Sequence, residues 1–391
     1  MRAGIAFLVI AYMLSQFYRA FLAVLSPVLM DELGATTGDL ARASGLWFIC
    51  FAAMQLPVGW ALDHLGPRRT AATLFLIGGG GGATIFALAQ TPGAITWAMM
   101  LIGIGCAPIL MATYYIFARQ YSAAIFGTLA GVTVGLSSLG NILSATPLAW
   151  LIAAFGWRAT VGGFAGLTIV IALAIALLVR DPEKPAGEAK GRLSDLLRMP
   201  QLWPILAMMF VCYAPAAGLR GLWISPYLAD RFSADLAQIG NATLVMGLAM
   251  VAGNFLYGPA DRLFGGRKRP ILIGNAIVAL ACLSFWLAPP QGFGMAIALF
   301  ALIGLCGASY PLVISHGRSF CPPHLTGRGV TLLNLFGMGG AGVMQFATGP
   351  TYAALARNND PATAYGTLLG LIGLIIIAGL ALYLWAKDST G

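Results

Sequence analysis

The chain has 391 residues, of which 59% are hydrophobic and only 9% are charged, and its formal net charge is +9. A soluble globular domain carries about 25% charged residues, so this composition excludes an ordinary soluble protein and predicts a polytopic all-α membrane protein. The six cysteines include no C-x-x-C pair, and we expect from them neither a disulfide nor a metal cluster.

Apolar stretches long enough to cross a bilayer as a helix, about 20 residues, follow one another along the whole chain. No small-residue cleavage site follows the first of them, so we expect it to be retained and not removed as a signal peptide. Twelve membrane-spanning helices are predicted in this way, at 4–30, 43–62, 70–90, 94–117, 127–153, 159–179, 202–229, 239–259, 271–288, 292–316, 329–355 and 363–386.

The basic residues of the loops predict the orientation of these spans. Sixteen of the 22 Lys and Arg lie in loops on one predicted side of the membrane and four on the other. Because loops rich in Lys and Arg stay in the cytoplasm, we expect both termini to be cytoplasmic, in a bacterial-type inner membrane. The basic residues are scattered over short loops, which argues against nucleic-acid binding.

The two remaining basic residues, Arg19 and Arg220, lie inside predicted spans. A charge there costs roughly 2.5–3.5 kcal/mol on insertion scales and therefore usually faces a cavity and has a function. No Asp or Glu lies in a span interior to neutralise them. We interpret both as lining a water-filled cavity that receives an anion. The alternative is that each guanidinium caps carbonyl groups of a broken helix.

Polar and aromatic residues share a helix face with each arginine, because positions three, four and seven apart align. Such neighbours suit a site in which the guanidinium binds an acidic group and aromatic rings pack on the rest of a solute. Helix–helix hydrogen bonding explains isolated amides in spans nearly as well. The candidate substrate-binding residues besides the arginines are Tyr12, Gln16, Tyr213, Trp223, Tyr227, Asn141 and Asn334.

The second half of the chain repeats the first at an offset of about 200 residues. SPVLMDELGATTGDL (26–40) matches SPYLADRFSADL (225–236), and Pro108 pairs with Pro311. The long polar stretch 180–201 is typical of a flexible cytoplasmic linker. We therefore expect two pseudo-symmetric six-helix bundles, at 1–179 and 202–391, joined by this linker.

The loop after the second span, GWALDHLGPRR (59–69), fits the G-x-x-x-D-x-x-G-x-R-R pattern of the major facilitator superfamily, which the whole chain resembles. The second copy, GPADRLFGGRKR (258–269), is one residue shorter between its glycine and its aspartate. In that family the loop locks the cytoplasmic gate, the aspartate facing a helix N-terminus and the arginines pairing across the halves. The resemblance implies gating roles for Asp63, Arg68, Arg69, Asp261 and Arg267.

The pattern around Arg19, with Tyr18 before it and Pro27 eight residues after it, resembles the first span of the organic-anion and organophosphate branches. There an arginine at this place binds the acidic group of the substrate. Tyr18 replaces the carboxylate that precedes the arginine in many anion symporters. Arg220 stands only six residues before Pro226, and two residues are about 200° of helix rotation. Strict symmetry of the two arginines therefore requires a distorted seventh span.

The sequence thus favours secondary active transport of a small anionic solute by alternating access, by a monomer in the lipid bilayer that needs no cofactor. Neither an ATP-binding loop nor a hydrolase motif occurs, so we expect no enzyme. All Asp and Glu lie at span edges or in loops. This leaves open anion exchange, facilitated movement, a proton carried with the substrate, or a proton carried by His316. The substrate and the direction of transport are not specified.

Other classes of function remain as alternatives. Drug efflux is one, although two cavity cations argue against lipophilic cations. Copper transport is another, since Met246 and Met250 stand one turn apart and thioethers bind Cu(I); methionine is equally a packing residue. The third is a non-transporting membrane receptor on the same fold.

Overall fold

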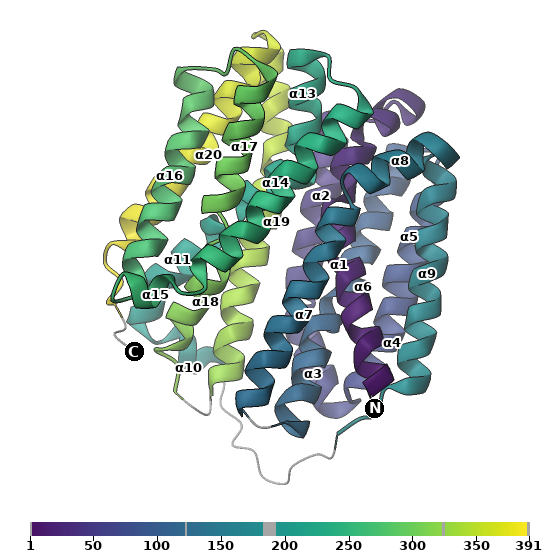
Figure 1. The fold of residues 1–391 in the computed structure, drawn as a ribbon, viewed down its shortest axis with the longest axis vertical. Helices are drawn as coiled ribbons and strands as arrows, with labels where there is room; N and C mark the ends of the chain where they lie inside the picture. Colours follow the sequence, from purple (N-terminus) through teal and green to yellow (C-terminus); the bar gives the residue numbers. More distant parts are fainter. Residues whose placement is uncertain (1, 122, 183–192, 323–324, 389–391) are drawn as a thin grey trace. The chain divides into compact units, whose positions relative to one another are not determined.

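The computed structural model describes residues 2–121, 123–182, 193–322 and 325–388, and all regular secondary structure in these ranges is helical. The chain divides into two compact units, Met1–Gly187 and Glu188–Gly391, here called unit 1 and unit 2 (Figure 1). Residues 183–192 of the predicted linker lie outside the described residues.

The helices of unit 1 run nearly without interruption, separated by short loops. Their bounds are α1 (Arg2–Leu33), α2 (Thr37–Ala53), α3 (Gln55–His64), α4 (Pro67–Leu74), the π-helical η1 (Phe75–Gly81), α5 (Gly82–Ala87), α6 (Pro92–Gln120), α7 (Ala123–Leu143), α8 (Thr146–Phe155) and α9 (Trp157–Leu178).

Unit 2 has the same organisation with more interruptions. Its elements are α10 (Leu193–Leu197), the 3-10 helix η2 (Pro200–Leu202), α11 (Trp203–Cys212), α12 (Ala214–Gly218), the π-helical η3 (Leu219–Trp223), α13 (Ile224–Phe232), α14 (Leu236–Tyr257), α15 (Ala260–Leu263), α16 (Lys268–Leu287), α17 (Phe293–Cys306), α18 (Tyr310–Arg318), α19 (Thr326–Ala356) and α20 (Pro361–Tyr383).

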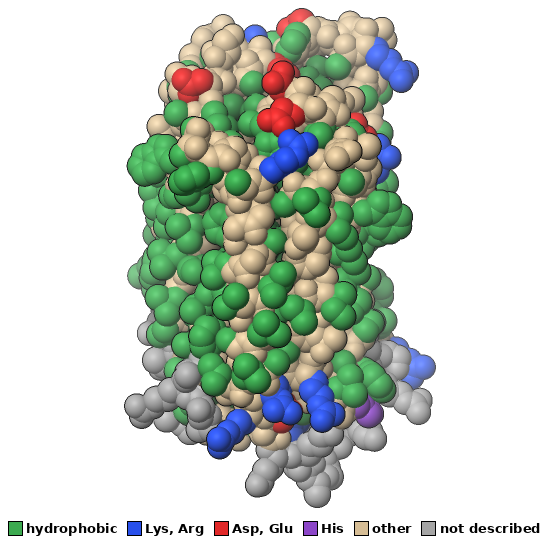
Figure 2. Space-filling view, turned by 90° about the vertical axis from the view of Figure 1, so that its right-hand side faces the viewer, with side chains coloured by type: hydrophobic (Ala, Val, Ile, Leu, Met, Phe, Trp, Pro, Cys, Tyr) green, Lys and Arg blue, Asp and Glu red, His purple; other side chains and the backbone are tan. Residues whose placement is uncertain are grey.

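Eleven helices of the described ranges are long and apolar enough to cross a membrane, and the bent pair Val132–Leu143 and Thr146–Phe155 makes a twelfth span. The prediction of twelve spans is confirmed. The fifth span, predicted as one helix, bends by 43° because Pro147, at the start of α8, cannot donate a backbone hydrogen bond. Figure 2 shows the matching surface, with hydrophobic side chains over a broad middle band and charged ones at the two ends.

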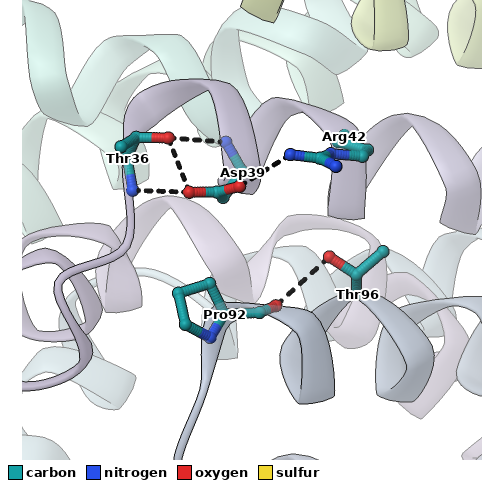
Figure 3. A network of polar contacts seen from close by, with 5 residues as sticks. All are labelled: Thr36, Asp39, Arg42, Pro92 and Thr96. Carbon is teal, nitrogen blue, oxygen red and sulfur yellow. Dashed lines mark hydrogen bonds and ion pairs between the residues drawn. The ribbon is translucent and has the colours of Figure 1, made fainter.

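Two of the helices begin before the apolar stretches from which they were predicted, because polar capping residues precede those stretches. The second span begins at Thr37, because Thr36 and Asp39 form a capping box before it. Arg42 then pairs with Asp39 at 2.7 Å (Figure 3). At the start of α6 the Thr91 side chain caps the helix by accepting from the Ala94 N–H at 3.3 Å, and within the first turns the Thr96 hydroxyl donates to the carbonyl of Pro92 at 3.2 Å (Figure 3). Since capping residues are polar, a hydropathy pattern alone starts these spans late, at 43 instead of Thr37 and at 94 instead of Pro92.

Close helix contacts in unit 1 recur in unit 2 about 200 residues later. Gly103 of α6 packs so tightly on the backbone of Trp47 in α2 that a Cβ would collide with its carbonyl oxygen. Gly304 of α17 packs in the same way on the carbonyl of Met246 in α14. A second matched pair joins Gly140 to Met13 and Gly340 to Phe210. The pseudo-symmetry read from the sequence is thus carried by equivalent glycine contacts.

Candidate functional site

The guanidinium of Arg19 lies over two aromatic rings of the neighbouring helix α2. Its Cζ is 5.3 Å from the centroid of Trp47 and 5.5 Å from that of Phe51. These two rings stack at 5.2 Å with an interplanar angle of 15°. Arg19 is only 8% exposed, and cation–π contacts contribute about 0.5–2 kcal/mol each. The sequence interpretation missed both rings, although their spacing of four residues places them on one helix face.

Tyr12 and Gln16 lie on the same helix as Arg19 and contact one another. The Gln16 Nε2 atom donates to the Tyr12 hydroxyl at 3.4 Å, and both residues are buried. Tyr12 also interacts electrostatically with Tyr114 of α6. Asn141 is half-buried on α7, directly after the glycine that packs on Met13 of α1. The structure therefore groups the predicted polar residues of unit 1 around α1.

Tyr18, in the place of a symporter carboxylate, faces the interior of its own bundle. Its hydroxyl lies 2.8 Å from Thr168 Oγ1 and donates to the carbonyl of Phe164 at 3.2 Å. Both partners belong to α9, and Tyr18 is fully buried. The residue therefore joins the first span of unit 1 to its last.

Arg220 of unit 2 is 3% exposed and lies against a glycine of α14. A Cβ on Gly247 would stand 3.1 Å from Arg220 Nε and 3.2 Å from Nη2. Arg220 interacts electrostatically with Tyr213, whose ring is 4.9 Å from that of Tyr310. The Tyr310 hydroxyl donates to Asn334 Oδ1. The structure thus links Arg220, Tyr213 and Asn334, and adds Tyr310, which the sequence interpretation did not single out.

The seventh span is distorted at the arginine, as symmetry with the first span requires. It breaks at Tyr213, α12 begins at Ala214 with Pro215 in its first turn, and the π-helical turn Leu219–Trp223 that contains Arg220 follows. A π turn holds more residues than an α turn and often marks a functional site. It changes the face on which the residues after Arg220 lie, so a face drawn with constant helical spacing does not apply here.

Trp223 and Tyr227 accordingly belong to a different cluster. The Trp223 indole donates to Thr348 at 3.0 Å, and its ring is 5.3 Å from that of Tyr352. The Tyr227 ring lies 5.5 Å from Tyr365 and 5.4 Å from two phenylalanines. Both residues are at most 3% exposed. They pack in the aromatic core of unit 2.

The loop 59–69, for which the resemblance implies a gating role, is held by an aspartate that follows the last span of unit 1. The Asp181 carboxylate accepts from the Arg68 backbone N–H at 2.7 Å, and its other oxygen is 3.9 Å from Arg68 Nε. The carboxylate also packs on Gly66, the N-cap residue of α4, which has a φ of 88°. A Cβ at this glycine would collide with the carboxylate. Asp63 and Arg69 are exposed. The carboxylate found at this helix N-terminus is Asp181, a residue that the sequence interpretation did not single out.

The second copy of this loop, residues 258–269, has the same arrangement. Asp388, after the last span, accepts from the backbone N–H groups of Arg267 at 3.1 Å and Lys268 at 3.2 Å, at the start of α16. Asp261 pairs with Arg267 Nε at 3.8 Å. The pairs Arg180-Asp181 and Lys387-Asp388 are a further sign of the repeat that the sequence contains.

His316, the possible proton carrier, is fully buried in unit 2. Its Nε2 atom is 2.9 Å from the carbonyl of Lys387, and its Nδ1 atom is 2.7 Å from the Tyr383 hydroxyl. A carbonyl only accepts, so Nε2 donates to it, while Nδ1 is hydrogen-bonded to the Tyr383 hydroxyl. His316 therefore ties the end of α18 to the segment after α20.

Met246 and Met250 pack on a neighbouring helix. A Cβ on Gly304 of α17 would lie 3.2 Å from the Cγ of each, and Met246 is fully buried. Within the described ranges, no group of three or more His, Cys, Asp or Glu could hold a metal ion.

The fold and the two buried cations define a polytopic helical membrane transporter built from two related halves. The family model of the Major Facilitator Superfamily matches residues 8–219, and the chain belongs to this superfamily. It is 24% identical over 319 residues to the probable sulfoacetate transporter SauU of Cupriavidus necator, covering 75% of this chain and 73% of that protein. It is 22% identical over 333 residues to a galacturonate transporter of Dickeya chrysanthemi, and the match covers 78% of this chain and 94% of that protein.

Solved structures share the fold. A bacterial homologue of the human lysosomal transporter Spinster, inward-facing and unoccupied, superposes with a TM-score of 0.78 at 16% identity, covering 98% of this chain and 96% of that one. A D-xylose–proton symporter superposes with a TM-score of 0.73 at 15% identity, covering 96% of each chain.

Proposed function

We propose that the protein moves a small organic anion across the membrane, binding its acidic group through Arg19 and Arg220. The observation that carries this proposal is the burial of two guanidinium groups inside spans whose interiors contain no Asp or Glu. Buried guanidinium groups favour an anionic ligand, because each offers a planar fork of donors that suits a carboxylate. The relatives support the choice, since sulfoacetate and galacturonate both carry a carboxylate.

Transport would proceed by alternating access, with bundles 1–179 and 202–391 rocking about the bound anion and the loop 180–201 joining them on the cytoplasmic side. The gate loops with Asp63 and Asp261 would latch one of the two states. Carboxylates at helix N-termini, such as Asp181 at α4 and Asp388 at α16, contribute about 0.3–1 kcal/mol, and a latch of this size is enough to bias two states and little enough to release. The absence of acidic residues from span interiors favours anion exchange, or entry of the substrate with its own proton.

The test is anion binding by purified protein, followed as thermal stabilisation by sulfoacetate, galacturonate and inorganic phosphate. A ligand at 100 times its dissociation constant stabilises by about 2.7 kcal/mol. Arg19→Lys keeps the charge but loses the planar fork, so its Kd should rise at least about tenfold, because hydrogen bonds to charged groups contribute about 1.5–3 kcal/mol. Arg220→Lys should show a smaller loss.

The matched control is Arg357→Lys, since Arg357 is exposed between α19 and α20. It should bind like the wild type. Two results would contradict the proposal. In the first, the wild type is stabilised by none of the three anions. In the second, both span variants bind every anion with unchanged affinity.

A further inference from the structure

Three tryptophans are among the largest fully buried side chains of the protein, and their indole N–H groups differ in one respect. The Trp157 indole donates to Glu32 Oε2 at 2.8 Å, and the Trp223 indole donates to Thr348 at 3.0 Å. The Trp47 Nε1 atom is buried and has no hydrogen-bond acceptor within reach among the described residues. Native proteins satisfy nearly all buried donors, so a buried indole N–H of this kind requires an explanation.

The position of Trp47 supplies the explanation. Its ring lies beneath the guanidinium of Arg19, 5.3 Å from Cζ, on the neighbouring helix of the same unit. The ring is held rigidly, stacked on Phe51 and edge-on to Phe48 at 4.9 Å, while its backbone is packed against Gly103. A rigid ring that carries an unpartnered N–H and lies next to a buried cation suits anion binding, because little ordering is required when the ligand arrives.

We propose that the Trp47 indole N–H donates to the acidic group that Arg19 binds, so that Trp47 is a second anion-binding residue of unit 1. The inference rests on the proposed function. It names a carboxylate or sulfonate as the bound group, since either has oxygens enough to accept from both donors. The equivalent position in unit 2, identified by the matching glycine contact, is Met246, which has no such donor. The indole donor is therefore particular to unit 1.

Trp47→Phe tests the donor, because phenylalanine keeps an aromatic ring beside Arg19 and removes only the N–H and the second ring. We expect its Kd for sulfoacetate and for galacturonate to rise about tenfold, the change that corresponds to ~1.4 kcal/mol. Trp157→Phe is the matched control, since it removes an equally buried indole whose N–H already has a protein acceptor. The control should melt at a lower temperature and bind both anions with unchanged Kd.

A second readout reports the N–H itself. In protein labelled with ¹⁵N at the indole, the Trp47 resonance is identified by its absence from the Trp47→Phe spectrum. It should move downfield when sulfoacetate is added to the wild type, because hydrogen bonding to an anion deshields the proton. The Trp157 resonance should stay in place.

The possible outcomes separate the explanations. An unchanged Kd in Trp47→Phe, with a lowered melting temperature as in the control, would mean that a buried water satisfies the N–H, and would overturn the inference while leaving the proposed function intact. If the Trp47 resonance does not shift when sulfoacetate is added, the inference is likewise overturned and the proposed function is left intact. A wild type that binds none of the three anions would refute the proposed function, and this inference with it.

Discussion

Gly247→Ala is a perturbation whose size can be worked from the structure. The new Cβ would stand 3.1 Å from Arg220 Nε and 3.2 Å from Nη2, whereas ordinary contacts begin at 3.4 Å. The guanidinium must therefore retreat by a few tenths of an ångström. Charge-assisted N–H···O bonds are effective at about 2.7–2.9 Å, so such a shift should disturb at least one of the bonds to the anion. At about 1.5 kcal/mol for that bond, affinity should fall roughly tenfold.

The fold should not suffer, because alanine is favoured over glycine in a helix by about 1 kcal/mol. The assay is the Kd for sulfoacetate and galacturonate from thermal shift, measured beside the melting temperature without ligand. Gly163→Ala, in α9, is the control, since open space surrounds a Cβ there. It should gain helix stability and keep its affinity.

A double-mutant cycle identifies the route of the effect. If Gly247 acts by positioning the guanidinium, Gly247→Ala should add little to the loss already caused by Arg220→Lys, because the fork is then absent. Wild-type affinity in Gly247→Ala, or losses that simply add in the double variant, would refute the reasoning.

Four further results are expected. Gly105→Ala should lower the unfolding free energy by about 1–3 kcal/mol, seen as a lower melting temperature, because its Cβ would collide with the backbone of Gly79 in η1. Asp388→Ala should cost about 0.5–2 kcal/mol in the same measurement, since it uncovers the N-terminus of α16. Tyr310→Phe should weaken the binding of galacturonate more than the binding of sulfoacetate, because galacturonate bears hydroxyls that can hydrogen-bond to the Tyr310 hydroxyl; the Kd values of both anions check this. Asp63→Asn should slow uptake into proteoliposomes while leaving folding and anion affinity unchanged; uptake at the wild-type rate would exclude the latch.

The spans could be predicted because they depend on local composition, and the repeat because the two halves share residues at a fixed offset. Twenty apolar residues can satisfy their backbone in a bilayer only as a helix, so length and hydropathy suffice. Arg19 and Arg220 could be singled out for the same reason, since a charge is conspicuous in an apolar stretch. The offset of about 200 residues is visible in the prolines and aspartates that the two halves share.

The environment of each arginine could not be predicted, because it depends on neighbouring helices. Trp47 and Phe51 are unremarkable in an apolar span, and only the packing of α2 on α1 gives them a role. Gly247 is one of 50 glycines and matters because a guanidinium rests on it. No simple residue pattern marks the π turn at Arg220. The sequence indicated only that some distortion was needed, because the arginine stands eight residues before its proline in the first half and six in the second.

Symmetry in this protein holds for the scaffold and fails around the two buried arginines. The glycine contacts that set helix spacing recur in both units, and so do the aspartates that cover α4 and α16. The arginines share no such equivalence. One rests on stacked aromatic rings beside an indole donor, and the other on a glycine near tyrosines and an amide. Helix spacing constrains both halves alike, whereas the residues around each arginine are not part of those contacts and can differ. Because the two guanidinium groups have unlike neighbours, we expect Arg19→Lys and Arg220→Lys to change the Kd for an anion by different factors, and equal changes would contradict this expectation.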